Sequence, residues 1–292
     1  MNLVVQGAAL APATLETLRQ AAGARALTPL APRAWRLDDA HHTLQLAALL
    51  RHYKLDCCAS LERPLSDYGL LVTDMDSTLI DIECIDEVAS LHGVGDAVGA
   101  ITTAAMQGEI DFAESLVRRT ALLAGLPEAA LARVYEERLA LNPGAEALLA
   151  AAQEAGLHTI LVSGGFTYFT ERLQQRLGFN AAHANTLEIR EGTLTGRLSG
   201  PIIDSEAKAA ILREARARLG LDATQTLAIG DGANDVPMLR EAGLAIAYHA
   251  KAVLRAEADI CLDHAGLDGV LHFFTRTAVP PAAHAAALPN NG

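Results

Sequence analysis

Residues 70–80, LLVTDMDSTLI, form the most informative stretch of the chain. An apolar run ends there at two aspartates, Asp74 and Asp76, which are separated by one residue. Residues i and i+2 of an extended chain point to the same side, so both carboxylates can converge just beyond the strand end, where open α/β sheets bind ligands. Converging carboxylates repel, which normally implies a bound cation or a shared proton. A lone D-x-D pair is more often a solvated turn, but the apolar strand before it and Ser77-Thr78 after it favour an active site.

The composition of the 292-residue chain, with 51% hydrophobic and 20% charged residues, is ordinary for a soluble globular protein. Its net charge of −12 argues against nucleic acid or an anionic membrane as a partner. No run approaches the ~20 apolar residues of a membrane span, and the N-terminus has no signal-peptide pattern. The four cysteines show no C-x-x-C spacing. We therefore expect a cytoplasmic protein with free thiols and no structural zinc.

The first 66 residues predict a small α+β domain. Its expected strands lie at 2–6, 34–38 and 55–60, and its expected helices at 12–24 and 40–53. A linker around Pro64 closes this segment, in which no convergent cluster of polar residues is evident.

From residue 69, strands and helices alternate, as in an α/β protein with a parallel, doubly wound sheet. Strands are expected at 69–74, 158–162, 226–230, 244–247 and 259–262, and helices at 144–155, 167–177, 206–219 and 234–242. The interval between the first two strands is too long for a bare loop and reads as mostly helical over 83–141. Its position suggests a helical cap over the site. Residues 277–292 predict a flexible tail.

Two further motifs suit a phosphate group. Ser163-Gly164-Gly165 follows a strand and precedes a helix, which exposes backbone N–H groups beside a helix N-terminus. An ordinary strand-to-helix turn is the alternative. We expect Ser205 to cap the next helix, which puts Lys208 in the first turn. A cation there opposes the helix dipole, so Lys208 is either directed at a ligand phosphate or a solvated surface lysine.

The stretch TLAIGDGANDVPML, residues 226–239, ends another buried strand in polar residues. Glycines on both sides of Asp231 let the backbone turn sharply and present this carboxylate at the same sheet edge. Asp74, Asp231 and a backbone carbonyl would make an oxygen-rich site suited to Mg²⁺. Asp235 could complete the ligand set or support it.

DMDST, SGG, a downstream lysine and GDGAND, in this order on alternating strands, resemble the haloacid dehalogenase-like hydrolases over roughly residues 68–275. Within that superfamily the match is closest to the phosphoserine phosphatases. The resemblance implies a Rossmann-like domain over 67–276, with a helical cap inserted at approximately 82–141. It also implies Mg²⁺-dependent hydrolysis of O-phospho-L-serine through an aspartyl-phosphate, the last step of serine biosynthesis.

The resemblance also assigns roles to the motif residues. Asp74 matches the nucleophile, and Asp76 matches the acid that protonates the leaving oxygen and then activates water. The positions that match phosphate-binding residues are Ser163, Gly164 and Lys208. The positions that match the metal site are Asp74, the backbone carbonyl of Asp76, Asp231, and the surrounding polar residues Asn234 and Asp235.

Substrate selection is expected from the cap. Glu83 occupies the family's position nine residues after the nucleophile, and Arg119 ends the matching run FAESLVRR, with Arg118 as the adjacent alternative. A carboxylate and a guanidinium in one pocket would bind the ammonium and carboxylate of an amino acid. Met106 and Phe112 match positions that enclose the ligand. Without the resemblance, Glu83 would read as a first-turn helix acid and Arg119 as part of a solvated helix face.

The N-terminal segment is similar to the ACT-like, amino-acid-binding regulatory modules that precede some phosphoserine phosphatases. Its candidate ligand loop, QGAALAPA, offers only Gly7, so serine feedback, formation of a homodimer and a structural role all stay open. One alternative function is a phosphatase or phosphotransferase acting on another small phosphomonoester. Another is a serine-sensing regulatory protein, although such a protein would not need Asp76.

Overall fold

The N-terminal module is a four-stranded antiparallel sheet covered on one face by two helices. The computed structural model describes residues 1–275, except for the side chain of Met106, and the tail expected over 277–292 lies outside the described residues. The strand order is β2-β3-β1-β4. The elements are β1 (Leu3–Gly7), α1 (Pro12–Ala21), β2 (Ala26–Ala31), β3 (Ala34–Asp38), α2 (Leu44–Tyr53) and β4 (Leu55–Ala59). Val5, Leu18 and Leu46 belong to the cluster that α1 and α2 form against the sheet.

The edge strand β2 was not predicted. Pro29 lies within it, and the register with β3 shifts between Pro29 and Ala31. Proline has no backbone N–H to donate to a neighbouring strand, so within sheets it is confined to edge strands and bulges. Its presence in this stretch therefore hid the strand from a reading of the sequence.

The second sheet has seven strands in the order β11-β10-β9-β5-β6-β7-β8. All neighbouring pairs are parallel except β7 and β8. Its strands are β5 (Leu70–Thr73), β6 (His158–Phe166), β7 (Ala181–Arg190), β8 (Thr193–Ser199), β9 (Thr226–Gly230), β10 (Leu244–Tyr248) and β11 (Ile260–Leu262). The predicted α/β core is confirmed, with β5 in the middle of the sheet.

Helices cover both faces of this sheet. They are α7 (Ala145–Glu154) and α8 (Thr167–Leu177) on one face, and α9 (Ser205–Arg218), α10 (Val236–Glu241) and α11 (Ala252–Arg255) on the other. Strand β5 shows why the sheet needs both layers, because Leu71 packs into the first cluster while Leu70 and Val72 pack into the second. All three side chains are buried, as expected for a strand covered on both faces.

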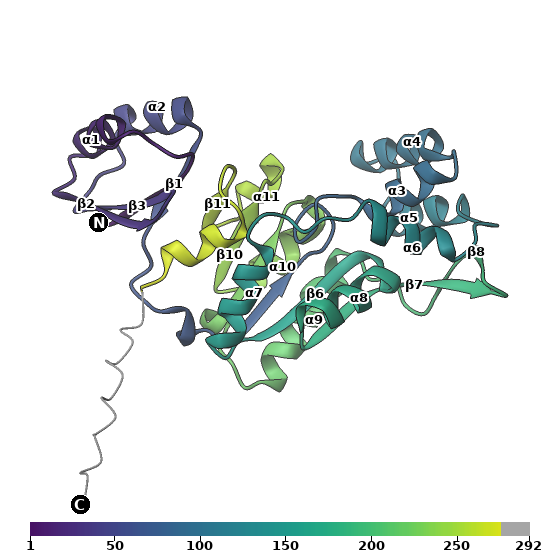
Figure 1. Cartoon of the computed structure of the whole chain (residues 1–292). Helices are drawn as coiled ribbons and strands as arrows, with labels where there is room; N and C mark the ends of the chain where they lie inside the picture. Colours follow the sequence, from purple (N-terminus) through teal and green to yellow (C-terminus); the bar gives the residue numbers. More distant parts are fainter. Residues whose placement is uncertain (276–292) are drawn as a thin grey trace, which may run out of the picture.

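The cap consists of the predicted helical insertion. Its helices are α3 (Cys84–Leu91), α4 (Gly95–Met106), α5 (Phe112–Ala121) and α6 (Ala129–Glu137). The chain segments that enter and leave the cap run side by side, joined by an isolated bridge between Ile80 and Leu141. Figure 1 shows the cap at the end of the core away from the N-terminal module.

A β-hairpin that the sequence analysis did not identify reaches from the core to this cap (Figure 1). It consists of β7 and β8, joined by Glu191 and Gly192, whose φ angles are 50° and 73°. Two-residue hairpin turns require such positive values. Leu194 of β8 exchanges backbone hydrogen bonds with Gly125 and Leu126 of the cap. The cap is therefore attached to the core by the hairpin as well as by its connecting segments.

The N-terminal module packs directly on the core beside β11 (Figure 1). Val4, on the sheet face without helices, joins the main core cluster. Gln6 is buried and donates to the Gly269 carbonyl at 3.0 Å. The Asp56 carboxylate accepts backbone hydrogen bonds from residues 263–265. No helix in the described part of the chain is long and apolar enough to cross a membrane.

Candidate active site

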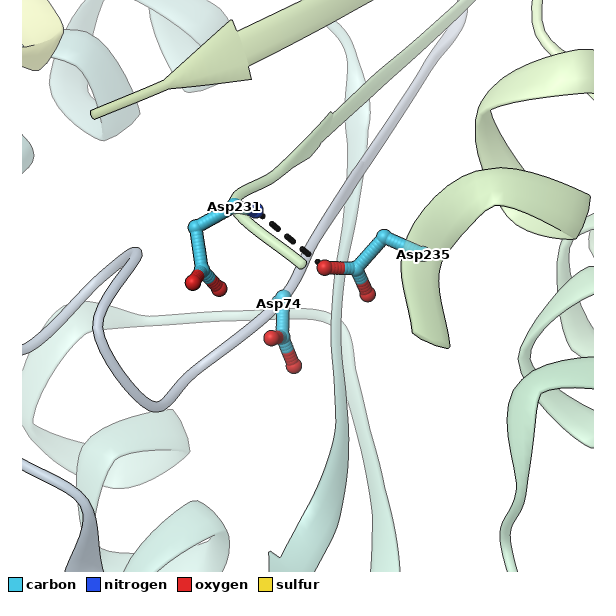
Figure 2. Close-up of side chains that lie close together, drawn as sticks. All are labelled: Asp74, Asp231 and Asp235. Carbon is cyan, nitrogen blue, oxygen red and sulfur yellow. Dashed lines mark hydrogen bonds between the residues drawn. The ribbon is translucent and has the colours of Figure 1, made fainter. Parts of the chain in front are cut away.

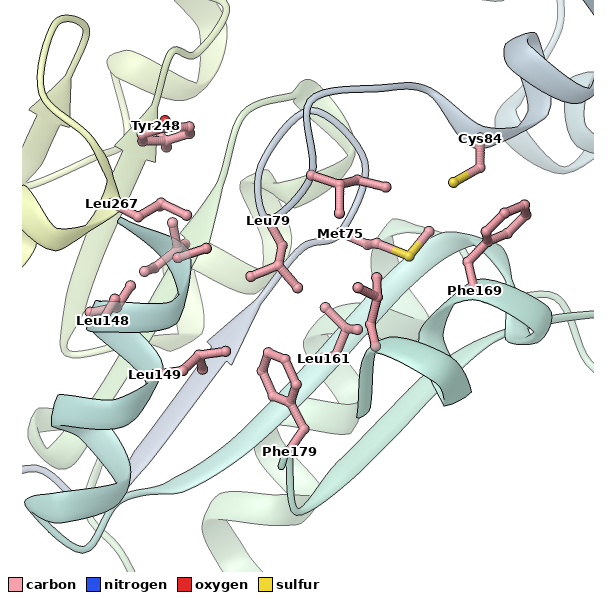
Figure 3. Packing of buried hydrophobic residues seen from close by; sticks show 14 of the residues in the cluster. Met75, Leu79, Cys84, Leu148, Leu149, Leu161, Phe169, Phe179, Tyr248 and Leu267 are labelled. Atoms are coloured by element: carbon pink, nitrogen blue, oxygen red, sulfur yellow. The ribbon is translucent and has the colours of Figure 1, made fainter. Parts of the chain in front are cut away.

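The two aspartates of the opening motif lie just beyond β5, at the carboxyl edge of the sheet. Met75, between them, is fully buried, and Figure 3 shows its side chain among core residues that include Leu161 and Phe169. The side chains of Asp74 and Asp76 line a shared pocket instead. The alternation predicted from the sequence therefore anchors the loop through its middle residue and presents both carboxylates.

A buried ion-pair network surrounds Asp74. The Lys208 ammonium donates to Asp74 Oδ1 at 2.7 Å and to Asp235 Oδ1 at 2.8 Å. Burial lowers the pKa of Lys208, but the Asp235 and Asp74 carboxylates outweigh this effect and raise the pKa above its usual value. Lys208 is therefore a fixed cation and not a solvated surface lysine.

The helix that carries Lys208 is capped differently from the prediction. Asp204 is the N-cap, and its carboxylate accepts a hydrogen bond from the Ala207 N–H at 2.9 Å, whereas Ser205 is already the first residue of α9. Aspartate and serine are equally good N-cap residues, so local sequence could not separate two neighbouring candidates.

Three aspartates gather at the ends of β5 and β9. Asp74, Asp231 and Asp235 each offer a carboxylate oxygen, and these oxygens lie within 4.8 Å of one another. Figure 2 shows the three side chains around a common point. Burial, and then the Asp235 charge, raise the pKa of Asp231 to about 6 and the pKa of Asp74 well above its usual value. This acidic set of oxygen ligands suits a hard divalent cation, which would relieve the repulsion.

Asp76 has the properties of a group that exchanges protons near neutral pH. Its carboxylate accepts a hydrogen bond from the Cys84 N–H at 3.1 Å and lies 3.4 Å from the Ser163 hydroxyl, which donates to it. Burial and the neighbouring Glu83 charge raise the pKa of Asp76 to about 7. A general acid–base group is most effective when its pKa is close to the working pH.

The predicted phosphate motif forms one wall of the site. A Cβ at Gly164 would lie 2.8 Å from Phe112 Cζ, and one at Gly165 would lie 2.7 Å from Asp76 Oδ2. Both glycines are therefore needed for close approach of the backbone. Ser163 Oγ accepts a hydrogen bond from the Gly165 N–H at 2.8 Å, which fixes the turn.

These residues line a single pocket of about 660 Å³ between the core and the cap. The predicted site residues that line it are Asp74, Asp76, Glu83, Phe112, Arg119, Gly164, Asp231 and Asn234. Ser163, Lys208 and Asp235 are buried. Ser163 donates to Asp76, and Lys208 donates to both Asp74 and Asp235. The side chain of Met106 lies outside the described part.

At the cap end, the pocket is lined by Glu83, the N-cap residue of α3, and by Arg119 of α5. Ser77 Oγ donates to Glu83 Oε1 at 2.8 Å. Arg119 Nε is buried and has no hydrogen-bond partner among the described residues, and burial lowers the pKa of this guanidinium. Arg118 instead forms an ion pair with Glu114 on the exposed side of α5. Of the two arginines, only Arg119 lines the pocket.

One charged residue that lines this pocket, Asp86, was not predicted from the sequence. It lies three residues after Glu83 on α3, so both can reach the same side of the helix. Its Oδ1 is buried and has no hydrogen-bond partner in the described part of the chain. Burial raises the pKa of Asp86, and the Arg119 charge opposes this shift. The i, i+3 spacing from Glu83 was the signal that could have identified it.

Comparisons with known proteins identify the family of the chain. The haloacid dehalogenase-like hydrolase family matches residues 71–240. The phosphoserine phosphatase of Albidiferax ferrireducens is 50% identical over 215 residues, which are 72% of this chain and 91% of that protein. The phosphoserine phosphatase of Vibrio cholerae is 42% identical over 235 residues, 80% of this chain and 70% of that protein.

Two solved structures are also similar. A crystal structure of a probable phosphoserine phosphatase from Vibrio cholerae, in unliganded form, has a TM-score of 0.82 and 37% identity and covers 93% of this chain and 85% of its own. The structure of a phospho-aspartyl intermediate analogue of phosphoserine phosphatase has a TM-score of 0.67 and 36% identity. That match covers 71% of this chain and 99% of the other.

Proposed function

The chain belongs to the haloacid dehalogenase-like hydrolases, and from this membership we propose that it hydrolyses O-phospho-L-serine to L-serine and phosphate. Phosphoserine phosphatases up to 50% identical support this activity. The observation that carries the proposal is a single pocket with Asp74 and Asp76 at one end and Glu83 and Arg119 at the other. These ends suit a phosphate group and the charged groups of an amino acid, respectively.

In the first half of the proposed reaction, a carboxylate oxygen of Asp74 attacks phosphorus and the bond from phosphorus to the serine oxygen breaks. Asp76 gives its proton to that oxygen, which leaves as the hydroxyl of serine. In the second half, water attacks phosphorus, Asp76 takes the proton from water, and Asp74 leaves as a free carboxylate. One acid–base residue thus serves both halves, in line with its pKa of about 7.

The proposed cation is Mg²⁺. Asp74, Asp231 and the backbone carbonyl of Asp76 would hold it, and Asp235 would support them through its contacts with Lys208 and the Asp231 N–H. When bound, it would neutralise the repulsion between an anionic nucleophile and an anionic substrate. Lys208 adds a positive charge beside Asp74, and the backbone at Gly164, which lines the pocket, is suited to the phosphate oxygens.

Substrate selection is proposed to depend on charge complementarity at the cap. The Arg119 guanidinium can bind a carboxylate with two parallel hydrogen bonds, and Glu83 can accept from an ammonium group. Phe112 covers Gly164 at close range and so limits the width of the pocket between these two ends.

Release of inorganic phosphate from O-phospho-L-serine tests this proposal. The full-length protein should hydrolyse this substrate with added Mg²⁺ and should lose this activity in EDTA. The Asp74→Asn variant should be inactive. An aryl phosphate serves as the second substrate. Hydrolysis of the aryl phosphate without hydrolysis of phosphoserine would support phosphatase activity but would rule out phosphoserine as the substrate.

We also propose that residues 1–66 form a separate module and residues 67–276 a phosphatase domain whose cap spans approximately 82–141. The two sheets support this division. A regulatory role or a role in a homodimer is proposed for the module, and sedimentation of the full-length protein tests the dimer.

A further inference from the structure

A second cavity, of about 410 Å³, lies where the N-terminal module, the core and the cap connections meet. It does not share any lining residue with the active-site pocket. The side chains that matter for its chemistry are those of Arg33, Ser77, Asp81, Asn142, His249 and His264. Arg33 lies between β2 and β3 of the module, while the two histidines belong to the core.

The cavity touches both chain segments that connect the core with the cap. Ser77 and Asp81 lie on the segment that enters the cap, and Asn142 lies on the segment that leaves it. The Asn142 side chain donates to the carbonyls of Thr78 and Ile80 at 2.8 and 3.0 Å, so it holds the two segments together. A molecule in this cavity would therefore contact the hinge region of the cap and the N-terminal module at once.

Two opposite charges line the cavity, Arg33 of the N-terminal module and Asp81 of the segment that enters the cap. Arg33 is exposed, and its guanidinium has no hydrogen bond or ion pair with any described residue. Asp81 accepts one hydrogen bond, from the Ala140 N–H to Oδ1 at 3.0 Å, and forms no ion pair within the described part of the chain. We propose that this cavity binds a small zwitterion of amino-acid size, with its anionic group at Arg33 and its cationic group at Asp81.

One hydrogen bond connects this cavity with the active-site pocket. Ser77 lines the cavity, and its hydroxyl donates to Glu83 in the substrate pocket. A ligand that favours one position of Ser77 therefore changes the position of Glu83, and such coupling is reciprocal between the two sites. Occupancy of the cavity changes the KM for the substrate. This consequence rests on the proposed function, whereas binding itself does not.

Calorimetric titration of the full-length protein with each of the twenty protein amino acids, one at a time, tests the binding site. At least one should bind to the wild type and to Arg51→Gln, which removes an exposed arginine of the same module outside the cavity. Binding should weaken by about tenfold or more in Arg33→Gln and in Asp81→Asn, because each loses a charge-assisted contact. Asn at position 81 retains an oxygen for the Ala140 N–H.

The fluorescence of Trp35, the single tryptophan, reports from the module during the same titrations. Absence of binding by every amino acid, or binding that survives in both Arg33→Gln and Asp81→Asn, would overturn the proposed site. If binding depends on both residues, the bound amino acid should change the KM for phosphoserine at least twofold in the wild type and not in Arg33→Gln. An unchanged KM would overturn the coupling alone.

Discussion

Lys208 holds Asp74 and Asp235 together, with hydrogen bonds of 2.7 and 2.8 Å from one ammonium group to two carboxylates. All three side chains are buried. The proposed nucleophile is therefore oriented before any substrate arrives, and its negative charge is partly balanced inside the protein. Preorganised charge of this kind contributes most of the rate enhancement in many enzymes.

Replacement of this lysine should lower both the stability of the protein and its kcat. Lys208→Met leaves two carboxylates buried without their cation, which typically costs about 3–5 kcal/mol, and should lower kcat by roughly 10²–10³. Urea unfolding and phosphate release measure the two effects. The matched control is Lys251→Met, because Lys251 lines the same pocket without a side-chain bond to either carboxylate. Equal losses in the two variants would contradict the role of Lys208.

The two neighbouring arginines should behave differently. Arg119→Ala should raise the KM for phosphoserine by about 10–100-fold, because a charge-assisted pair with the substrate carboxylate is lost. An aryl phosphate without a carboxylate should be hydrolysed nearly as before. Arg118→Ala removes a side chain that forms an ion pair with Glu114 on the exposed side of α5, so its kinetics should stay close to the wild type. A larger effect of Arg118→Ala would reverse the assignment.

Asp86 should contribute to recognition of the amino group. Its Oδ1 is buried without a hydrogen-bond partner among the described residues, and Asp86 lines the pocket together with Arg119. Asp86→Asn should therefore raise the KM for phosphoserine by roughly tenfold with little change in kcat. Glu87→Gln is the control, since Glu87 is adjacent in sequence but does not line the pocket. A fall in kcat that is the same for phosphoserine and an aryl phosphate would show that Asp86 acts on the chemistry instead.

The raised pKa of Asp76 predicts a pH-dependent stability in the absence of metal. Its pKa of about 7 in the folded protein exceeds the unfolded value of about 3.9, so the folded state binds more protons between these values. Stability therefore falls as the pH rises through this window. Asp76→Asn has no carboxylate to ionise in the buried site. Its free energy of unfolding relative to the wild type should therefore rise by ~2–4 kcal/mol between about pH 4 and pH 8. Urea unfolding in EDTA measures this difference, and a difference that does not vary with pH would refute it.

Much of the fold could be predicted because the decisive signals are local. The strand ends at Asp74 and Asp231, and the glycines at 164 and 165, lie within short motifs whose spacing is typical of an α/β sheet edge. Topology then brings these ends together without further information. The helical insertion could be predicted for a similar reason, because a long helical interval after the first strand cannot be a bare loop.

Contacts between distant residues could not be predicted from the sequence. Lys208 and Asp74 are 134 positions apart, and only the folded chain shows that the lysine is directed at carboxylates inside the protein. The β7–β8 hairpin was missed although Glu191-Gly192 was a usable turn signal. Asp86 was missed because its role depends on the orientation of α3, which helical periodicity alone does not fix.

The central claim is that Asp74 carries the phosphoryl group during turnover. Acid quenching of the wild type and of Asp76→Asn during reaction with O-phospho-L-serine, followed by borohydride reduction, converts an aspartyl-phosphate to homoserine. Mass spectrometry of the peptide that contains residues 70–80 then locates the change. The account predicts reduction at position 74 in the wild type, and less of it in Asp76→Asn, which can neither protonate the leaving serine oxygen nor activate water. Reduction at another aspartate, or phosphate release with position 74 unmodified in both proteins, would contradict it.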